Sequence, residues 1–112
     1  MSIAEFQHQI FEVALSSAIC DIPIVRRISP TAIKLRVYLT LAGYIDIFYN
    51  RETDRVAFAL IQQGNRVYGA DNTGGWHLHP FNDPSQHIPL STAMSFADFV
   101  KEIENFYQRT LA

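Results

Sequence analysis

The stretch Ile33-Lys34-Leu35-Arg36-Val37-Tyr38-Leu39-Thr40-Leu41 decides the fold, because aliphatic side chains alternate with polar or aromatic ones along its whole length. Successive side chains of a β-strand point to opposite faces of the sheet, so the odd-numbered residues share one face. A face made only of aliphatic side chains must pack against a core. The pattern therefore predicts a strand that is half buried.

Further strand signals on both sides extend this segment into a meander. Ala42-Gly43 is a turn signal, and the alternation resumes over 44–49, which predicts a hairpin. Further strands are predicted over 56–61 and 66–68, each after a polar turn, and an edge strand over 22–28. We therefore expect an antiparallel meander of four to five strands.

Helix signals lie near the two ends of the chain. Ser2-Ile3-Ala4-Glu5 and Ser95-Phe96-Ala97-Asp98 each have the spacing of a capping box, and Met94 can pack against Phe99 across the first turn. Apolar residues then recur at three- and four-residue steps, which predicts amphipathic helices from 3 to about 17 and from 96 onward. The expected fold is a single α+β domain over residues 1–112, with the meander packed against both helices. Its predicted core consists of Leu35, Val37, Leu39, Ile45, Ile47, Phe58, Leu60, Phe99, Ile103 and Phe106.

The charge balance argues against a protein that binds nucleic acid by overall attraction. Nine Lys and Arg stand against eleven Asp and Glu, which gives a formal net charge of −2 in 112 residues. A local basic patch stays open, because Arg26-Arg27, Lys34 and Arg36 lie close together in the sequence beside Tyr38. A weak RNA contact by this patch is therefore compatible with the sequence.

Two features favour a cytoplasmic protein without a membrane partner. Cys20 is the single cysteine, so no intramolecular disulfide can form, as is typical of a reducing compartment. No stretch approaches the roughly 20 apolar residues of a membrane span, and the N-terminus lacks the basic and apolar regions of a signal peptide. We expect a cytoplasmic location.

Most of the histidines lie in one segment after the meander. The chain has four, and His77, His79 and His87 follow the flexible pair Gly74-Gly75. The sequence around Trp76 to His79 is typical of extended chain, so the first two imidazoles should project to one face and Trp76 to the other. Paired imidazoles suit proton transfer near neutral pH, and neutral imidazole is also a common metal ligand.

Three interpretations of this segment remain open. In the first, His77 and His79 bind a metal with a third ligand from His87 or Asp71. In the second, no metal or other cofactor is needed: one histidine accepts a proton, the other donates one, and Arg36 or Arg66 stabilises negative charge, a set that fits RNA cleavage. In the third, Trp76, Leu78 and Phe81 pack a last strand on the core and the histidines are ordinary surface residues.

The second interpretation defines the candidate site. Its expected catalytic residues are His77, His79 and Arg66, and its expected binding residues are Asp71, Asn72, Trp76 and His87. No metal or cofactor is expected in it. Whether the protein is an enzyme at all is left open by the sequence.

The order of motifs resembles the TumE-type toxin family. The resemblance covers about residues 35–87 and is carried by the hairpin segment 43–49, the segment 66–72 and the loop rich in histidine and proline that ends at His87. It implies a small toxin neutralised by an antitoxin protein, and the positions that match are Asp71, Asn72, His77, His79 and His87. We therefore expect a small cytoplasmic toxin-like protein that acts on RNA through the histidine loop, with an antitoxin, RNA or a second copy of the chain as partner. The alternative is a non-catalytic interaction or homodimerisation domain.

Overall fold

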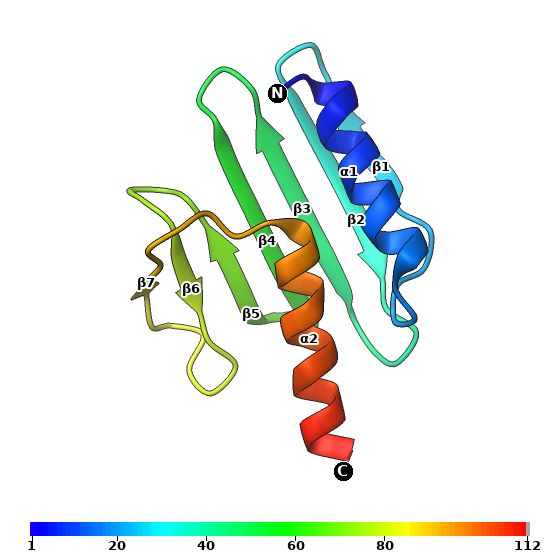
Figure 1. Ribbon diagram of the computed structural model, residues 1–112, viewed down its shortest axis with the longest axis vertical. Helices are drawn as coiled ribbons and strands as arrows, with labels where there is room; N and C mark the ends of the chain where they lie inside the picture. Colours follow the sequence, from blue (N-terminus) through cyan, green and yellow to red (C-terminus); the bar gives the residue numbers. More distant parts are fainter. Residues whose placement is uncertain (112) are drawn as a thin grey trace.

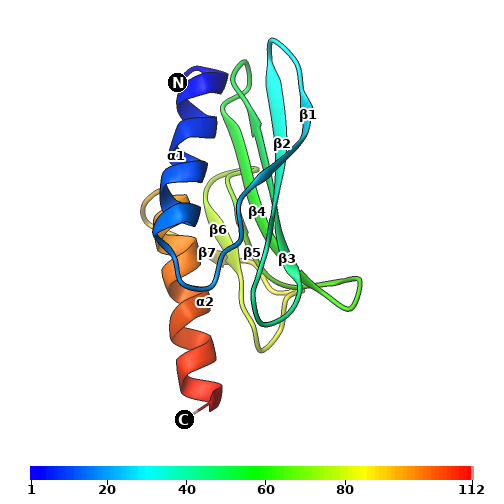
Figure 2. The same ribbon diagram turned by 90° about the vertical axis from the view of Figure 1, so that its right-hand side faces the viewer.

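Seven strands form one antiparallel sheet in which each strand pairs with its neighbours in sequence (Figure 1). The computed structural model describes residues 1–111. The strands are β1 (Ile24–Ile28), β2 (Ala32–Tyr38), β3 (Tyr44–Asn50), β4 (Arg55–Gln62), β5 (Asn65–Asp71), β6 (His77–His79) and β7 (Ile88–Pro89). Two helices, α1 (Ile3–Ser16) and α2 (Phe96–Leu111), lie on the same face of this sheet (Figure 2). The α+β class and the antiparallel sheet are confirmed.

The expectation of four to five strands is wrong, because β6 and β7 extend the sheet beyond the meander. Extended chain was predicted over 76–79, but this three-residue strand was not counted in the meander, and β7 with two residues is too short for an alternation to be recognised. The first strand also differs slightly from its expected range of 22–28 and begins only at Ile24. Leu41 is a further correction: it lies beyond the end of β2 in the turn and is 56% exposed.

The face of the sheet that the helices cover holds the core. All the residues predicted for the core are buried except Phe106, which is only partly buried and stacks on Phe81 with ring centroids 3.8 Å apart. Phe99 of α2 lies at the centre, 5.4 Å from the ring of Phe58 and 5.0 Å from that of Tyr68. The period-two interpretation of the long strands is therefore confirmed on this face.

Both helices begin at the predicted caps. The backbone N–H of Glu5 donates to the Ser2 hydroxyl over 3.0 Å, and the Ser2 N–H donates back to the Glu5 carboxylate over 3.1 Å. The same exchange joins Ser95 and Asp98 over 3.1 and 3.4 Å. None of the described helices is long and apolar enough to cross a membrane.

The opposite face of the sheet, which we call the open face, is covered by no helix within residues 1–111 (Figure 2). Residues paired across antiparallel strands have their side chains on the same face, so the register defines rows that cross the sheet. The first row on the open face consists of Arg27, Lys34, Phe48, Ala57, Asp71 and His77. The second row consists of Ile24, Arg36, Asp46, Ala59, Gly69 and His79. Both rows therefore run from a basic residue on β2 to a histidine on β6, and the first row has a second basic residue on β1.

Candidate functional site

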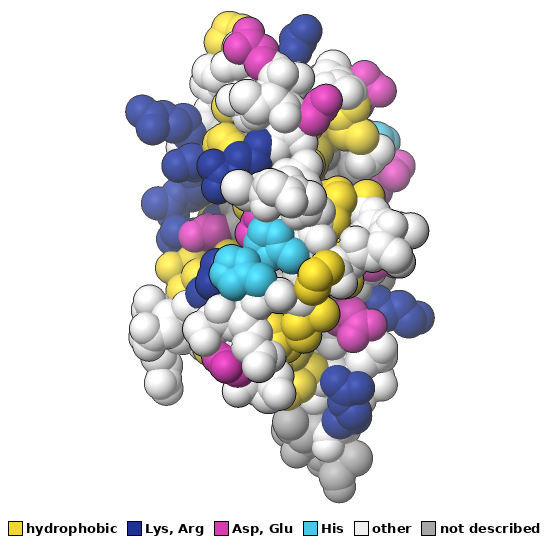
Figure 3. Space-filling view, turned by 90° about the vertical axis from the view of Figure 1, so that its left-hand side faces the viewer, with side chains coloured by type: hydrophobic (Ala, Val, Ile, Leu, Met, Phe, Trp, Pro, Cys, Tyr) yellow, Lys and Arg dark blue, Asp and Glu magenta, His cyan; other side chains and the backbone are white. Residues whose placement is uncertain are grey.

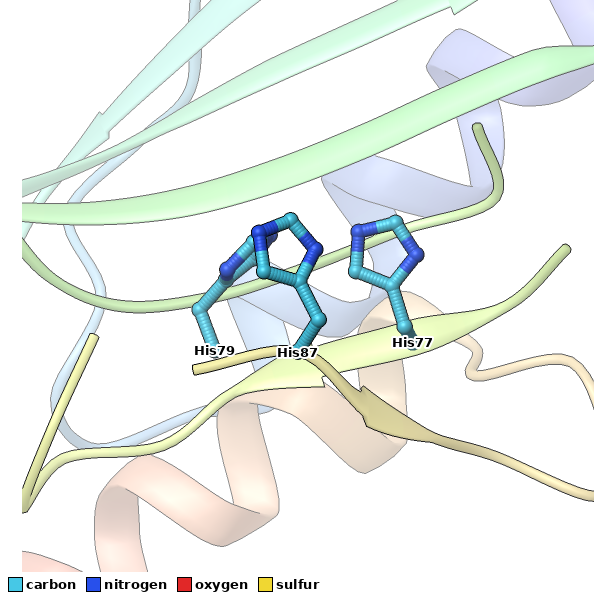
Figure 4. Close-up of side chains that lie close together, drawn as sticks. All are labelled: His77, His79 and His87. Carbon is cyan, nitrogen blue, oxygen red and sulfur yellow. The ribbon is translucent and has the colours of Figure 1, made fainter. Parts of the chain in front are cut away.

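Three histidines meet at the β6 and β7 end of the open face. Figure 4 shows His77 and His79 rising from β6, with His87 on the chain that leads into β7. The ring centroids are 4.9 Å apart for His77 and His79, 4.9 Å for His77 and His87, and 4.6 Å for His79 and His87. One ring nitrogen from each lies within 4.8 Å of those of the other two. We call these residues the histidine cluster.

The strand register explains why the cluster forms. Alternation along β6 puts His77 and His79 on one face, as expected from the sequence. The antiparallel pairing of Leu78 with Ile88 then runs toward His87 and brings it opposite His79. His79 is only 2% exposed, whereas His87 is exposed. The cluster therefore has one buried member and one that solvent or a ligand can reach.

Asp71 is the acidic partner of the cluster. Its Oδ1 lies 3.3 Å from Nε2 of His77, and its Oδ2 lies 3.2 Å from Nε2 of His79. The backbone N–H of Thr73 donates to Oδ1 over 3.0 Å, which fixes the carboxylate at the end of β5. Burial raises the pKa of Asp71, but the hydrogen bonds from Thr73 and His79, together with attraction to His77, hold it below its usual value. Asp71 is therefore ionised at neutral pH.

Backbone carbonyl groups hold the other sides of the two rings. Nδ1 of His77 lies 3.0 Å from the carbonyl oxygen of Gly75, and Nδ1 of His79 lies 3.2 Å from that of Gln86. Each ring is thus fixed between a carbonyl oxygen and a carboxylate. Rings oriented in this way can bind a cation beside Asp71, and proton exchange with a substrate would require it to replace the contact of a ring with Asp71.

Arg66 lies beside His79, as the site prediction requires. A bulge in the pairing of β4 with β5 matches Arg66 with Ile61, so its side chain lies on the open face. A Cβ atom on Gly69 would lie 3.1 Å from Cδ of Arg66 and 3.5 Å from Cδ2 of His79, so both side chains cross directly over this glycine. The guanidinium donates to the carbonyl oxygen of Pro84 over 3.2 Å. Figure 3 shows basic side chains next to the histidines on this side of the molecule.

Two of the predicted binding residues do not join the cluster. Trp76 packs against the core on the helix side, with its ring centroid 6.4 Å from that of Phe58. Asn72 holds the loop instead: its amide oxygen accepts from the Val56 N–H over 2.9 Å, and its amide nitrogen donates to the Asp54 carbonyl over 2.7 Å. The structure thus gives both residues structural contacts. Arg36, the other cation considered for the cluster, is also elsewhere and pairs with Asp46 over 2.8 Å.

A basic groove occupies the other half of the open face. Its volume is about 740 Å³, and Phe48 lies within it. The cations that line it are Arg26, Arg27, Lys34, Arg36 and Arg55. Lys34 and Arg55 both lie over the Phe48 ring, at 5.9 and 5.6 Å from its centroid. Asp46 is the acidic residue in the lining.

Sequence reasoning found only part of this groove. The basic patch of Arg26-Arg27, Lys34 and Arg36 was recognised, but Phe48 and Arg55 were not assigned to it. The alternation along β3 could have indicated Phe48: Ile47 and Tyr49 point into the core, so the side chain between them points to the other face of the sheet. Small residues, Ala57 and Ala59, floor the groove on β4, and Gly69 continues this floor toward His79.

Comparison of the chain with protein-family models, with curated proteins and with solved structures found no significant match. A functional proposal therefore rests on the geometry of the open face and on the resemblance noted in the sequence of residues 35–87.

Proposed function

We propose that the protein is a toxin-like effector that binds single-stranded RNA across the open face and cleaves it at the histidine cluster. The observation that carries this proposal is the register of the sheet. It puts Lys34 and Phe48 in one row with Asp71 and His77, and Gly69 with His79 in the next. The toxin class itself comes from the resemblance of residues 35–87 to the TumE-type family.

The basic groove has the two properties that single-stranded RNA requires. Cations contact the phosphates, and an aromatic ring on an open sheet offers a surface on which a base can stack. Lys34, Arg55 and Phe48 provide both within one groove. Strands are about 4.8 Å apart, so Phe48 on β3 lies roughly 10 Å from Asp71 on β5. A strand of RNA stacked on Phe48 would therefore extend to the histidine cluster within a few nucleotides.

The cluster and Arg66 offer the groups that phosphodiester cleavage needs. In RNA cleavage the 2′-oxygen bonds to phosphorus while it loses its proton, and the 5′-oxygen leaves with a proton as the P–O bond breaks. An acceptor and a donor of protons must flank the phosphate, and a cation must offset the developing negative charge. His87 is exposed and lies against His77 and His79, and Arg66 extends over Gly69 beside them, so a phosphate that reaches His87 would be next to all four groups.

A cleavage assay with a matched control tests this function. Purified protein is incubated with a fluorescent single-stranded RNA, and the products are resolved by gel. The double variant His77→Ala/His79→Ala should lose activity by roughly 10²–10⁴-fold, the usual contribution of general acid–base groups. His8→Ala is the control, because His8 lies on α1 and pairs there with Glu12.

Growth of bacteria after tightly induced expression tests the toxin class separately. Arrest by the wild type and by His8→Ala, but not by the double variant, would support a toxin that acts through the cluster. Rescue by co-expression of a small protein encoded beside this one would identify that protein as the antitoxin. Normal growth with the soluble wild type, together with intact RNA in the cleavage assay, would contradict the proposal.

One observation favours the alternative of an interaction domain. Ile24 and Ile28 are exposed on β1, an edge strand of the described sheet, and Ile22 is exposed just before it. An apolar edge strand can pair with the same strand of a second copy. Sedimentation analysis that finds a dimer, disrupted by Ile24→Lys, with no RNA cleavage or toxicity, would favour homodimerisation as the function.

A further inference from the structure

The hydrogen bonds of His77 and His79 are incomplete in one specific way. A neutral imidazole has one N–H group and one lone pair. Both nitrogens of His77 face oxygen acceptors, namely the Gly75 carbonyl and the Asp71 carboxylate. His79 repeats this arrangement with the Gln86 carbonyl and the other oxygen of Asp71. In each neutral ring, therefore, one lone pair faces an oxygen that also has no proton to give.

A cation between the two Nε2 atoms and the Asp71 carboxylate removes this conflict. Each ring then keeps its N–H on Nδ1, where it donates to a backbone carbonyl, and its Nε2 lone pair binds the cation. His79 is only 2% exposed, so its Nε2 has little access to water as an alternative partner.

We propose that the cluster binds a divalent transition-metal ion of the zinc class. Its ligands are Nε2 of His77, Nε2 of His79 and the Asp71 carboxylate, with His87 as the exposed fourth ligand. The site goes beyond the proposed function: with the ion bound, the ion would take the place of the free imidazoles in the chemistry of the cluster, and zinc binding itself does not depend on RNA cleavage. The proposal also departs from our sequence-based expectation of a site without metal. The spacing of His77 and His79 alone could not distinguish a metal site from a metal-free one.

The distances fit such an ion. Ligand atoms about 2.0–2.1 Å from a tetrahedral zinc are roughly 3.3 Å from one another. The two contacts between Nε2 and the carboxylate measure 3.3 and 3.2 Å. One ring nitrogen from each of the three histidines lies within 4.8 Å of those of the other two, and the proposal requires the exposed His87 side chain to move closer to the ion.

The surroundings of the ligands also match a metal centre. Histidines that bind metal through one nitrogen almost always donate the other N–H to a carbonyl or carboxylate. The carbonyl groups of Gly75 and Gln86 take this role, and the Thr73 N–H holds the ligand Asp71. Mostly imidazole donors select zinc, nickel, copper or cobalt over magnesium or calcium.

The bound ion would change the chemistry available on the open face. A divalent ion exposed on the His87 side can polarise a phosphate oxygen, which imidazoles alone cannot do. Arg66 beside His79 would then contact the same phosphate. The ion would also stabilise the short strands β6 and β7, because it ties His87 to both histidines of β6.

Zinc binding by the protein without RNA is the direct test. The chain is expressed without a histidine tag, treated with a chelator, desalted and titrated with Zn²⁺ by calorimetry. Co²⁺ is then used as a spectroscopic probe of coordination. We expect one ion per chain, a tetrahedral Co²⁺ spectrum, a higher melting temperature with Zn²⁺ and no such effect of Mg²⁺.

Variants assign the ligands. His77→Ala and Asp71→Asn should each weaken zinc binding by on the order of 100-fold. Loss of a group that only holds a ligand in place already weakens metal binding by about 10–100-fold, and loss of a ligand should cost at least as much. His87→Ala should weaken zinc binding by roughly 10-fold or more and change the Co²⁺ spectrum. Because His87 is exposed, this substitution should not impair folding. His8→Ala is the control.

The proposal is overturned if the wild type binds no stoichiometric zinc, or if His77→Ala and Asp71→Asn bind zinc as tightly as His8→Ala. Because no RNA is present, a negative result leaves cleavage by imidazoles standing, and loss of RNA cleavage leaves the metal site standing.

Discussion

The two faces of the sheet are built from alternate residues of the same strands but differ in composition and role. On β3, Ile45, Ile47 and Tyr49 are buried toward the helices, whereas Asp46 and Phe48 lie on the open face. On β5, Tyr68 and Ala70 are buried in the core, whereas Asp71 faces the histidines across the open face. The helix face contributes apolar burial, and the open face contributes charge, imidazoles and a floor of small side chains.

This difference teaches where stability and chemistry reside. Burial of apolar surface is the main source of folding free energy, and it is concentrated under α1 and α2. The exposed charged side chains of the open face add little stability but are placed by the strands beneath them. Mutations on the two faces should therefore separate into losses of stability and losses of binding.

The largest effect is expected from Phe99→Ala. Phe99 is fully buried and contacts Phe58 and Tyr68. Its truncation should lower the free energy of unfolding by about 3–5 kcal/mol, as for other buried phenylalanines. Urea denaturation followed by circular dichroism measures the loss.

Phe48→Ala is the matched variant on the open face. It should lower the free energy of unfolding by about 1 kcal/mol or less, as is usual for surface positions. It should also weaken binding of single-stranded RNA by about 1–3 kcal/mol, the value of one stacked base. Similar losses of stability for both phenylalanines would break the distinction between the faces.

Gly69→Val is expected to have an intermediate effect, and it acts where the groove meets the cluster. A Cβ atom at this position lies 3.1 Å from Cδ of Arg66 and 3.2 Å from the carbonyl oxygen of Phe58. The extra atoms of valine should cost about 1–3 kcal/mol of stability through overpacking. They should also displace His79 and Arg66, so that zinc binding and RNA cleavage both weaken.

The graded variant Gly69→Ala makes this prediction sharper. It adds only the Cβ atom and should cause a smaller change in both properties than valine does. Calorimetry with zinc and thermal melting of the two variants measure the series. A valine variant with the zinc affinity of the wild type would mean that the open face tolerates bulk beside His79.

The sequence predicted the helix face far better than the open face. Alternation along 33–39 and 45–49 identified the buried residues, because burial depends on one strand at a time. The caps at Ser2 and Ser95 were equally local and are confirmed. Strand number was underestimated because β6 and β7 owe their existence to pairing with β5 and with each other, which no single segment reveals.

The site depended on register, which the sequence does not display. Asp71 meets His77 only because the β5 and β6 strands pair at that position, and Arg66 reaches the open face only through a bulge. His87 likewise depends on how β7 pairs. Trp76 is different: alternation put it on the face opposite His77, so the sequence already contained the evidence that it packs in the core.

The smallest effect is expected from Ser95→Ala, which tests whether the two faces are independent. The serine hydroxyl accepts the Asp98 N–H over 3.1 Å at the start of α2. Loss of this cap should cost about 1 kcal/mol of stability, as other serine caps do. Zinc affinity should stay at the wild-type value, since α2 packs on the other side of the sheet from the cluster. In the double variant Ser95→Ala/His87→Ala, measured without zinc, the changes in stability of the two single variants should add within about 0.5 kcal/mol, as for distant sites. A larger deviation from additivity would show that the sheet transmits strain from the helix face to the histidines. The cluster would then be energetically coupled to the core.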